Sequence, residues 1–127
     1  MVRSIFADAR EFEVVGEAVG GEDAIIKAIS LKPDLIVMDF SIPDLDGAET
    51  TRQILARVPG TRVLAWSSDA RWETVDRMFA AGARGYVVRG PDGEELVRAA
   101  RAILDGALFL SRALFRAGPP EPGPRTA

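Results

Sequence analysis

Three side chains that could act together chemically each follow a short apolar run of the chain: Asp39, Ser67 and Arg89. A carboxylate placed like Asp39 can attack a phosphoryl group and form a mixed anhydride. That chemistry needs a divalent cation, a second cation near the new phosphate and a hydroxyl that bonds its oxygens. Arg89 and Ser67 suit the last two roles. In a simpler interpretation, Asp39 caps a loop and Arg89 pairs with it across the surface.

The composition excludes several other kinds of chemistry. The chain has 127 residues, with no His and no Cys. It therefore lacks the means for a disulfide framework, a thiolate zinc site, a cysteine nucleophile, a Ser-His-Asp triad or a histidine phosphocarrier. A formal net charge of −3 provides no basic field for nucleic acid. Because the chain shows no apolar run of membrane-spanning length and no signal peptide, we expect a cytoplasmic protein without membrane contact.

Short apolar runs alternate with amphipathic stretches along the chain. The runs predict strands over residues 13–17, 34–38, 62–66 and 85–88. Apolar residues at helical spacing predict helices near residues 22–31, 48–58, 71–81 and 96–103. This alternation, with short connections, indicates an α/β fold with a doubly wound parallel sheet. Since sites in such folds lie at the carboxyl ends of the strands, we expect Asp39, Ser67 and Arg89 to converge on one edge.

Four motifs, in the same order along the chain, resemble those of one protein family. They are Phe12–Ala18 (FEVVGEA), Val37–Gly47 (VMDFSIPDLDG), Val63–Ser68 (VLAWSS) and Ala81–Arg89 (AGARGYVVR). They resemble the strands and loops of response-regulator receiver domains, in the branch with LuxR-type DNA-binding outputs, from about residue 12 to residue 112. The resemblance implies a flavodoxin-like, doubly wound parallel sheet of about five strands with helices on both faces. It also implies a signalling module of a two-component system rather than an enzyme.

The resemblance assigns a role to each residue that matches the family motifs. Asp39 would accept a phosphoryl group from a histidine kinase or phosphotransfer protein, with Mg²⁺ bound by Asp39 and the backbone carbonyl of Ser41. Ser67 and Arg89 would bond the phosphoryl group. Tyr86 would rotate inward as Ser67 moves, which changes the face formed by the fourth helix, fifth strand and fifth helix.

Two residues depart from the family pattern in the site itself. Arg89 stands where the family has Lys, and its larger planar head alters the geometry of phosphate pairing. Residues 1–9 resemble the family's first strand, with Asp8 at the first of two metal-binding acids. Ala9 replaces the second acid, and the loss of a carboxylate from a site for a hard cation weakens magnesium binding.

The start of the chain is also too short for the family topology. Only about five residues, Asp8–Phe12, are available to connect this stretch to the next expected strand, whereas a parallel crossover needs about a dozen. The N-terminal strand–helix unit is therefore expected to be truncated. We favour a strand over residues 1–9, but Val2, Ile5, Phe6 and Ala9 also have helical spacing. In that alternative, the segment is a remnant of the first helix, and the first strand is absent with both of its acids.

The residues after the last predicted helix allow several interpretations. Ala107–Ala117 (ALFLSRALFRA) is unusually apolar. It could fold back over the sheet face left open by the missing first helix, or pair with a second chain. It could equally be a linker helix. We expect a receiver-like domain over residues 1–117 and a flexible Pro/Gly-rich tail over residues 118–127.

Two functions from different classes follow from these observations. The first is a receiver that is phosphorylated on Asp39 and acts on a downstream protein partner or through self-association. The second is a degenerate receiver that binds partners, or dimerises, without phosphorylation. No helix-turn-helix can follow residue 117, so we expect no direct binding of nucleic acid. A small hydrolase is disfavoured because no second acid–base group accompanies Asp39.

Overall fold

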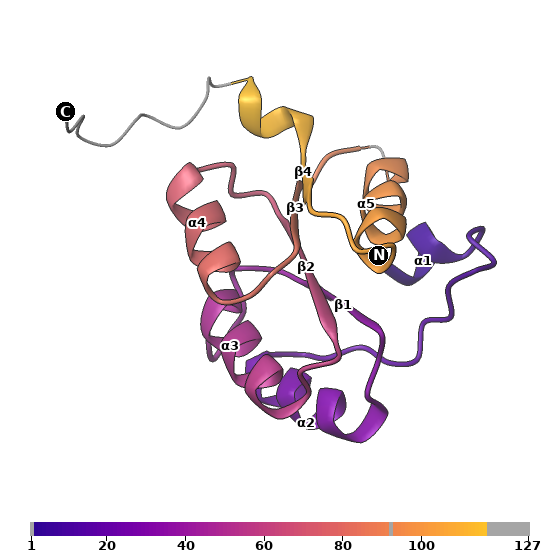
Figure 1. Cartoon of the computed structure of the whole chain (residues 1–127), viewed down its shortest axis with the longest axis vertical. Helices are drawn as coiled ribbons and strands as arrows, with labels where there is room; N and C mark the ends of the chain where they lie inside the picture. Colours follow the sequence, from indigo (N-terminus) through magenta and orange to yellow (C-terminus); the bar gives the residue numbers. More distant parts are fainter. Residues whose placement is uncertain (1, 92, 117–127) are drawn as a thin grey trace.

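The computed structural model describes residues 2–91 and 93–116 (Figure 1). Its elements, in order, are α1 (Val2–Phe6), α2 (Gly21–Leu31), β1 (Leu35–Met38), α3 (Gly47–Arg57), β2 (Arg62–Ser67), α4 (Trp72–Ala80), β3 (Gly85–Val88), α5 (Glu94–Leu104), β4 (Phe109–Leu110) and a 3₁₀ helix η1 (Arg112–Phe115). None of the helices in these two ranges has both the length and the apolar character needed to cross a bilayer. The tail expected over residues 118–127 lies outside the described residues.

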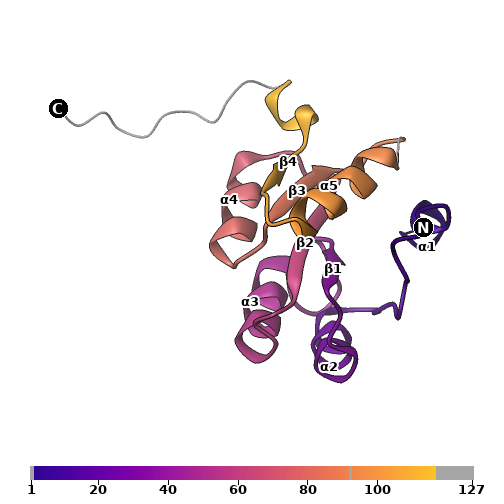
Figure 2. The ribbon, with the colours of Figure 1, turned by 45° about the vertical axis from the view of Figure 1, so that its right-hand side comes forward.

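The described strands form one parallel sheet in the order β1-β2-β3-β4. Strand β2 is central and buried on both faces, and its side chains alternate between two clusters. Val63 and Ala65 face the cluster that contains residues of α2, α3 and α4. Leu64 and Trp66 face the cluster that contains residues of α1 and α5. Because alternate side chains of β2 enter clusters on opposite faces, helices must cover both faces of the sheet. This confirms a doubly wound sheet with helices on both faces (Figure 2).

The strand that we favoured over residues 1–9 is wrong. Residues 2–6 form the short helix α1, as in the alternative of a first-helix remnant. Phe6 is buried in the cluster that contains the apolar residues of α5. Its ring lies edge-on to that of Phe12, with centroids 4.9 Å apart. The helical spacing of the apolar residues therefore determines the structure, because it lets one face of the segment pack against α5.

The strand expected over residues 13–17 is also wrong, and the sheet has four described strands rather than about five. The segment contains β-forming valines, but it pairs with none of the described strands in a hydrogen-bonded ladder. A lone extended segment gains no such bonds and is not a stable strand. Val14 of this segment, and Phe12 just before it, nevertheless pack against the α5 cluster.

The apolar segment after α5 folds back on the domain, and it contacts both faces of the sheet. It forms β4 beside β3 and then η1, so it is not a linker α-helix. Phe109 packs against the cluster on the α5 side, the face that we expected the segment to cover, together with residues of α5 and α1. Leu114 is fully buried on the other face, in the cluster shared with α4.

Gly47 is a position where the backbone requires the smallest residue. A Cβ there would collide with the carbonyl oxygen of Asp39 and with Cα of Phe40. We expect Gly47→Ala to lower the free energy of unfolding by about 1–3 kcal/mol, because backbone atoms must shift to accept the methyl group. Gly60→Ala is the matched control, since a Cβ at Gly60 meets open space. Urea unfolding of both variants tests this, and equal stabilities would contradict the close approach.

Candidate functional site

The carboxyl ends of β1 and β3 bring Asp39 and Arg89 together. Arg89 Nη2 lies 2.9 Å from Asp39 Oδ2, in an ion pair whose side chains are 39% and 29% exposed. The second carboxylate oxygen, Oδ1, accepts a long hydrogen bond of 3.2 Å from the backbone N–H of Ser41. The surface pairing of Asp39 with Arg89 that the sequence suggested is thus present. Of the two carboxylate oxygens, Oδ1 accepts the longer hydrogen bond and Oδ2 forms the ion pair.

Arg89 is held in place by residues at the end of β2. Its guanidinium carbon lies 4.2 Å from the centroid of the Trp66 ring, and Nη2 also donates to the Trp66 carbonyl oxygen at 3.3 Å. Its backbone N–H donates to the Ser67 carbonyl oxygen at 2.8 Å. A planar guanidinium can stack on an indole and bond a carboxylate at the same time, which a lysine ammonium does less well. Trp66 therefore fixes the cation beside Asp39.

Ser67 is buried at the end of β2, and the loop that follows it is organised by Asp69. The Ser67 hydroxyl oxygen accepts a hydrogen bond of 3.1 Å from the Asp69 backbone N–H. The Asp69 carboxylate accepts bonds from Arg71 Nε at 3.0 Å, from Arg71 Nη2 at 2.8 Å and from the Thr74 hydroxyl at 2.8 Å. The bonds from Arg71 hold the pKa of Asp69 well below its usual range.

Tyr86 lies inward, with its side chain fully buried. Its hydroxyl donates a hydrogen bond of 2.5 Å to the Asp69 carbonyl oxygen. Burial raises the pKa of the Tyr86 phenol, and a hydrogen bond with Ser67 offsets part of that rise. The residue predicted to move with Ser67 is thus connected to it through Asp69.

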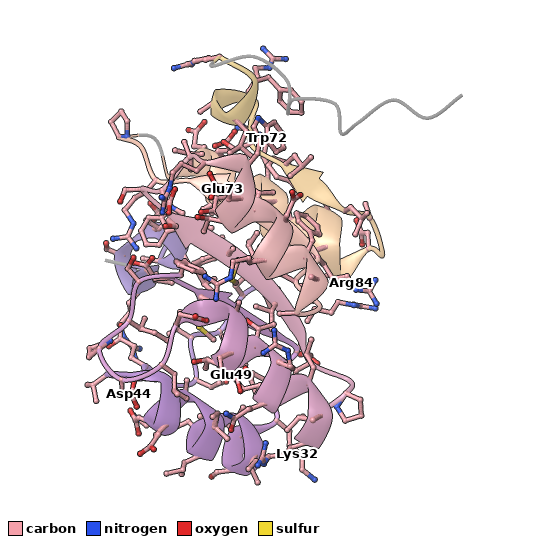
Figure 3. All side chains as sticks on the ribbon, turned by 90° about the vertical axis from the view of Figure 1, so that its left-hand side faces the viewer. Lys32, Asp44, Glu49, Trp72, Glu73 and Arg84 are labelled. Carbon is pink, nitrogen blue, oxygen red and sulfur yellow. The ribbon has the colours of Figure 1, made fainter. Side chains whose placement is uncertain are left out.

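The loop between β1 and α3 also positions two helices, and sequence reasoning missed both carboxylates responsible. Asp44 accepts hydrogen bonds from the backbone N–H groups of Gly21 (2.6 Å) and Glu22 (3.0 Å), at the start of α2. Figure 3 labels Asp44 in this loop, next to α2. These bonds lower the pKa of Asp44. The two segments lie more than twenty residues apart in sequence, so no local pattern could have revealed this cap.

Asp46 caps α3 in the same loop. Its Oδ1 accepts a hydrogen bond of 2.7 Å from the Glu49 backbone N–H, and its Oδ2 pairs with Arg77 Nη2 of α4 at 2.8 Å. The first of these contacts lowers the pKa of Asp46 most, and the Arg77 hydrogen bond lowers it further. The Asp46-x-x-Glu49 spacing resembles a helix capping box, a signal that could have identified this residue. The Arg77 pair joins the loop after Asp39 to α4.

Asp8 lies away from this arrangement, against α5. It lines a groove with Gly93, Glu94 and Arg98. Among the described residues, no three Asp, Glu, His or Cys side chains gather in a group that could hold a metal ion. The described residues around Asp39 therefore include no such group, and Asp39 itself is paired with Arg89, so they do not fit a Mg²⁺ ion, which prefers several oxygen ligands.

Comparisons with known proteins identify the family. A family model of the response regulator receiver domain matches residues 1–101. The chain belongs to the response-regulator receiver family. The receiver domain is a signalling module of two-component systems rather than a catalytic enzyme. The resemblance inferred from the motifs is therefore confirmed.

Individual relatives agree with this assignment. The response regulator GacA of Pseudomonas aeruginosa is 34% identical over 110 residues, which cover 87% of this chain and 51% of GacA. A LuxR-family response regulator from Aurantimonas has a solved structure with a TM-score of 0.85 and 32% identity, covering 90% of this chain and 81% of that one. The chain thus spans about half the length of the curated relatives it matches. CheY in a CheX–CheY–BeF₃–Mg²⁺ complex from Borrelia burgdorferi, at 23% identity and a TM-score of 0.74, shares the fold; coverage is 80% of this chain and 77% of that one.

The contacts of Asp69 predict a pH-dependent contribution to stability. We expect Asp69→Asn to lower the free energy of unfolding by about 1 kcal/mol at pH 7, because the bonds from Arg71 lose their charged acceptor. Since the folded-state pKa lies below the ordinary value of 3.8, this advantage is complete above that value and disappears as the pH falls through the lower one. Urea unfolding over a pH series measures the difference.

Asp76→Asn, at an exposed position of α4, the helix that follows the Asp69 loop, is the control. We expect it to change the stability by less than about 0.5 kcal/mol. A difference between Asp69→Asn and the parent protein that stays constant down to strongly acidic pH would contradict the assigned role of Asp69.

Proposed function

We propose that this chain is a receiver module that accepts a phosphoryl group on Asp39 from a histidine kinase or phosphotransfer protein of the cytoplasm. The observation that supports this most directly is the pairing of a partly exposed Asp39 carboxylate with Arg89 at the carboxyl edge of the sheet. The carboxylate is accessible to a phosphoryl donor, and a fixed cation stands beside the place where new negative charge would appear. The proposed module covers residues 1–117.

In this reaction the chain supplies the nucleophile as a carboxylate, and the leaving group belongs to the donor. Oδ1 of Asp39 attacks the phosphorus of a phosphohistidine, an O–P bond forms and the P–N bond breaks. The electron pair of that bond goes to the imidazole nitrogen of the donor, which then takes up a proton. Arg89 bonds Oδ2 in the resting protein and, in the product, pairs with the more highly charged phosphoryl oxygens.

Signalling would use the residues already connected to this edge. In the proposed switch, the Ser67 hydroxyl turns from the Asp69 backbone to a phosphoryl oxygen. Because the Tyr86 hydroxyl bonds the Asp69 carbonyl, a shift of the Asp69 loop changes the environment of Tyr86. The altered surface is the face formed by α4, β3 and α5, and it would act on a downstream protein partner or on a second copy of the chain.

Magnesium is not assigned a step in this proposal. The family resemblance assigns the metal to Asp39, the Ser41 carbonyl and an acid at Asp8, but Asp8 lines the groove beside α5. Arg89 is the cation that contacts Asp39 among the described residues. Charge compensation is therefore assigned to Arg89.

A second candidate function is supported by the same ion pair. Arg89 neutralises Asp39 without any phosphoryl group, and Tyr86 is already buried. Both observations fit a degenerate receiver that serves as a phosphorylation-independent interaction or dimerisation module. The two functions differ in whether Asp39 ever becomes modified.

Incubation with acetyl phosphate, followed by intact-mass measurement, distinguishes these functions. We expect the mass gain of one phosphoryl group on the parent protein, and no gain on Asp39→Asn, because an amide is a much weaker nucleophile than a carboxylate. Asp76→Asn should be modified like the parent protein. If no gain is seen at high magnesium and high donor concentration, phosphorylation is excluded and the degenerate receiver is supported.

A further inference from the structure

The segment after α5 is bonded to the backbone of the predicted switch residue Tyr86. Strand β4 runs parallel to β3, at the opposite edge of the sheet from β1 (Figure 1). The backbone N–H of Phe109 donates to the Arg84 carbonyl oxygen at 3.1 Å, and that of Ser111 donates to the Tyr86 carbonyl oxygen at 2.9 Å. Any displacement of the Tyr86 backbone therefore acts directly on this segment, Phe109–Phe115, which we call the C-terminal strap.

Side chains of the strap attach it to both neighbouring helices. Leu114 is fully buried in the cluster that contains Tyr86 and residues of α4. Phe115 lies edge-on to Trp72 of α4, with centroids 5.2 Å apart and an interplanar angle of 68°. Figure 3 labels Trp72 at the start of α4, next to the strap. The Ser111 hydroxyl donates to Glu95 of α5 at 2.8 Å.

The same attachment continues toward the phosphoacceptor edge. The Tyr86 hydroxyl bonds the Asp69 carbonyl oxygen, and the Asp69 N–H bonds the Ser67 hydroxyl. Tyr86 is thus in contact with the Ser67 loop at one end and with the strap at the other. Its ring and backbone are the shared component of the two regions.

The outer side of the strap is weakly covered. Phe115 is 50% exposed and Leu110 is 40% exposed, although Leu114 between them is fully buried. A short strand and a single 3₁₀ turn with half-exposed apolar residues belong to the part of a fold that opens at low free-energy cost. The contacts that hold the strap at Tyr86 are therefore the burial of Leu114 in the same cluster and the hydrogen bond from the Ser111 backbone N–H to the Tyr86 carbonyl oxygen.

We propose that the C-terminal strap is the element that reports the position of Tyr86: it is closed while Tyr86 is buried and detaches from α4 and β3 when Tyr86 leaves. The signalling face of the proposed function then includes this strap, whose detachment uncovers α4 and the edge of β3. The attachment of the strap to Tyr86 does not depend on phosphorylation. Only the assignment of phosphate as the trigger, which would hold Tyr86 inward and the strap closed, rests on the proposed function.

A cysteine introduced into the strap tests this attachment, because the chain has no native Cys. Leu114→Cys places a thiol at a fully buried position of the strap, and Met78→Cys places one at a fully buried position of α4 in the same cluster. The reaction rate of each thiol with a chromogenic disulfide reagent is measured with Tyr86 present and in combination with Tyr86→Ala. Ser111→Cys, a nearly isosteric change at another buried strap position, replaces Leu114→Cys if that variant fails to fold.

We expect Tyr86→Ala to raise the reaction rate of the strap thiol at least about tenfold more than that of the Met78→Cys thiol, because the strap opens without α4. Equal increases at both thiols would indicate general destabilisation and overturn the proposal. An unchanged rate at the strap thiol would overturn it as well.

A parallel sample with acetyl phosphate, followed by intact mass, separates the two proposals. A mass gain together with slower reaction of the strap thiol supports phosphate as the trigger, because phosphorylation would hold Tyr86 inward and the strap closed. A mass gain without any change in rate overturns that trigger. Absence of a mass gain overturns the proposed phosphorylation, and the Tyr86→Ala comparison then decides alone whether the strap follows Tyr86.

Discussion

The burial of β2 on both faces is the constraint on which the rest of the structure depends. Alternate residues of this strand enter opposite clusters, so helices must cover both sides of the sheet. The parallel arrangement that results from helical crossovers places the carboxyl ends of β1, β2 and β3 at one edge. Asp39, Ser67 and Arg89 meet there because their strands are adjacent, although they are distant in sequence.

At that edge, the negative charge of Asp39 is compensated by Arg89 of the same chain. Arg89 is stacked on Trp66 and bonded to Asp39, so its position is determined by β2 as well as by its own strand. Lysine in this place would remain a mobile point charge, whereas a stacked guanidinium is oriented in advance. The family model and the relatives identify a receiver domain. The carboxylate proposed as its phosphoacceptor, however, is paired with an arginine, and the described residues contain no group of three Asp, Glu, His or Cys side chains that could hold a metal ion.

Acidic residues in the loop after Asp39 have mainly a structural role. Asp44 caps α2, and Asp46 caps α3 while pairing with Arg77 of α4. One loop therefore fixes the starts of two helices and contacts a third, and the first residue of that loop is the candidate phosphoacceptor. The C-terminal strap has the corresponding position at the opposite edge of the sheet, where it contacts Tyr86, α4 and α5.

The sequence by itself determined the elements whose stability is local or periodic. The buried runs at 34–38, 62–66 and 85–88, and the helices that follow them, are strands and helices in the structure because their apolar spacing suits only one arrangement. Their order was also enough to place Asp39 and Arg89 at one edge. Tertiary contacts decided the conformation of segments whose local sequence pattern allows more than one structure. Residues 1–9 have the apolar spacing of a strand as well as that of a helix, and Val2–Phe6 form a helix because α5 offers a surface to pack against. Residues 13–17 pair with none of the described strands. The strap, the Asp44 cap and the fixed orientation of Arg89 depend on partners far along the chain, whose proximity only the folded structure establishes.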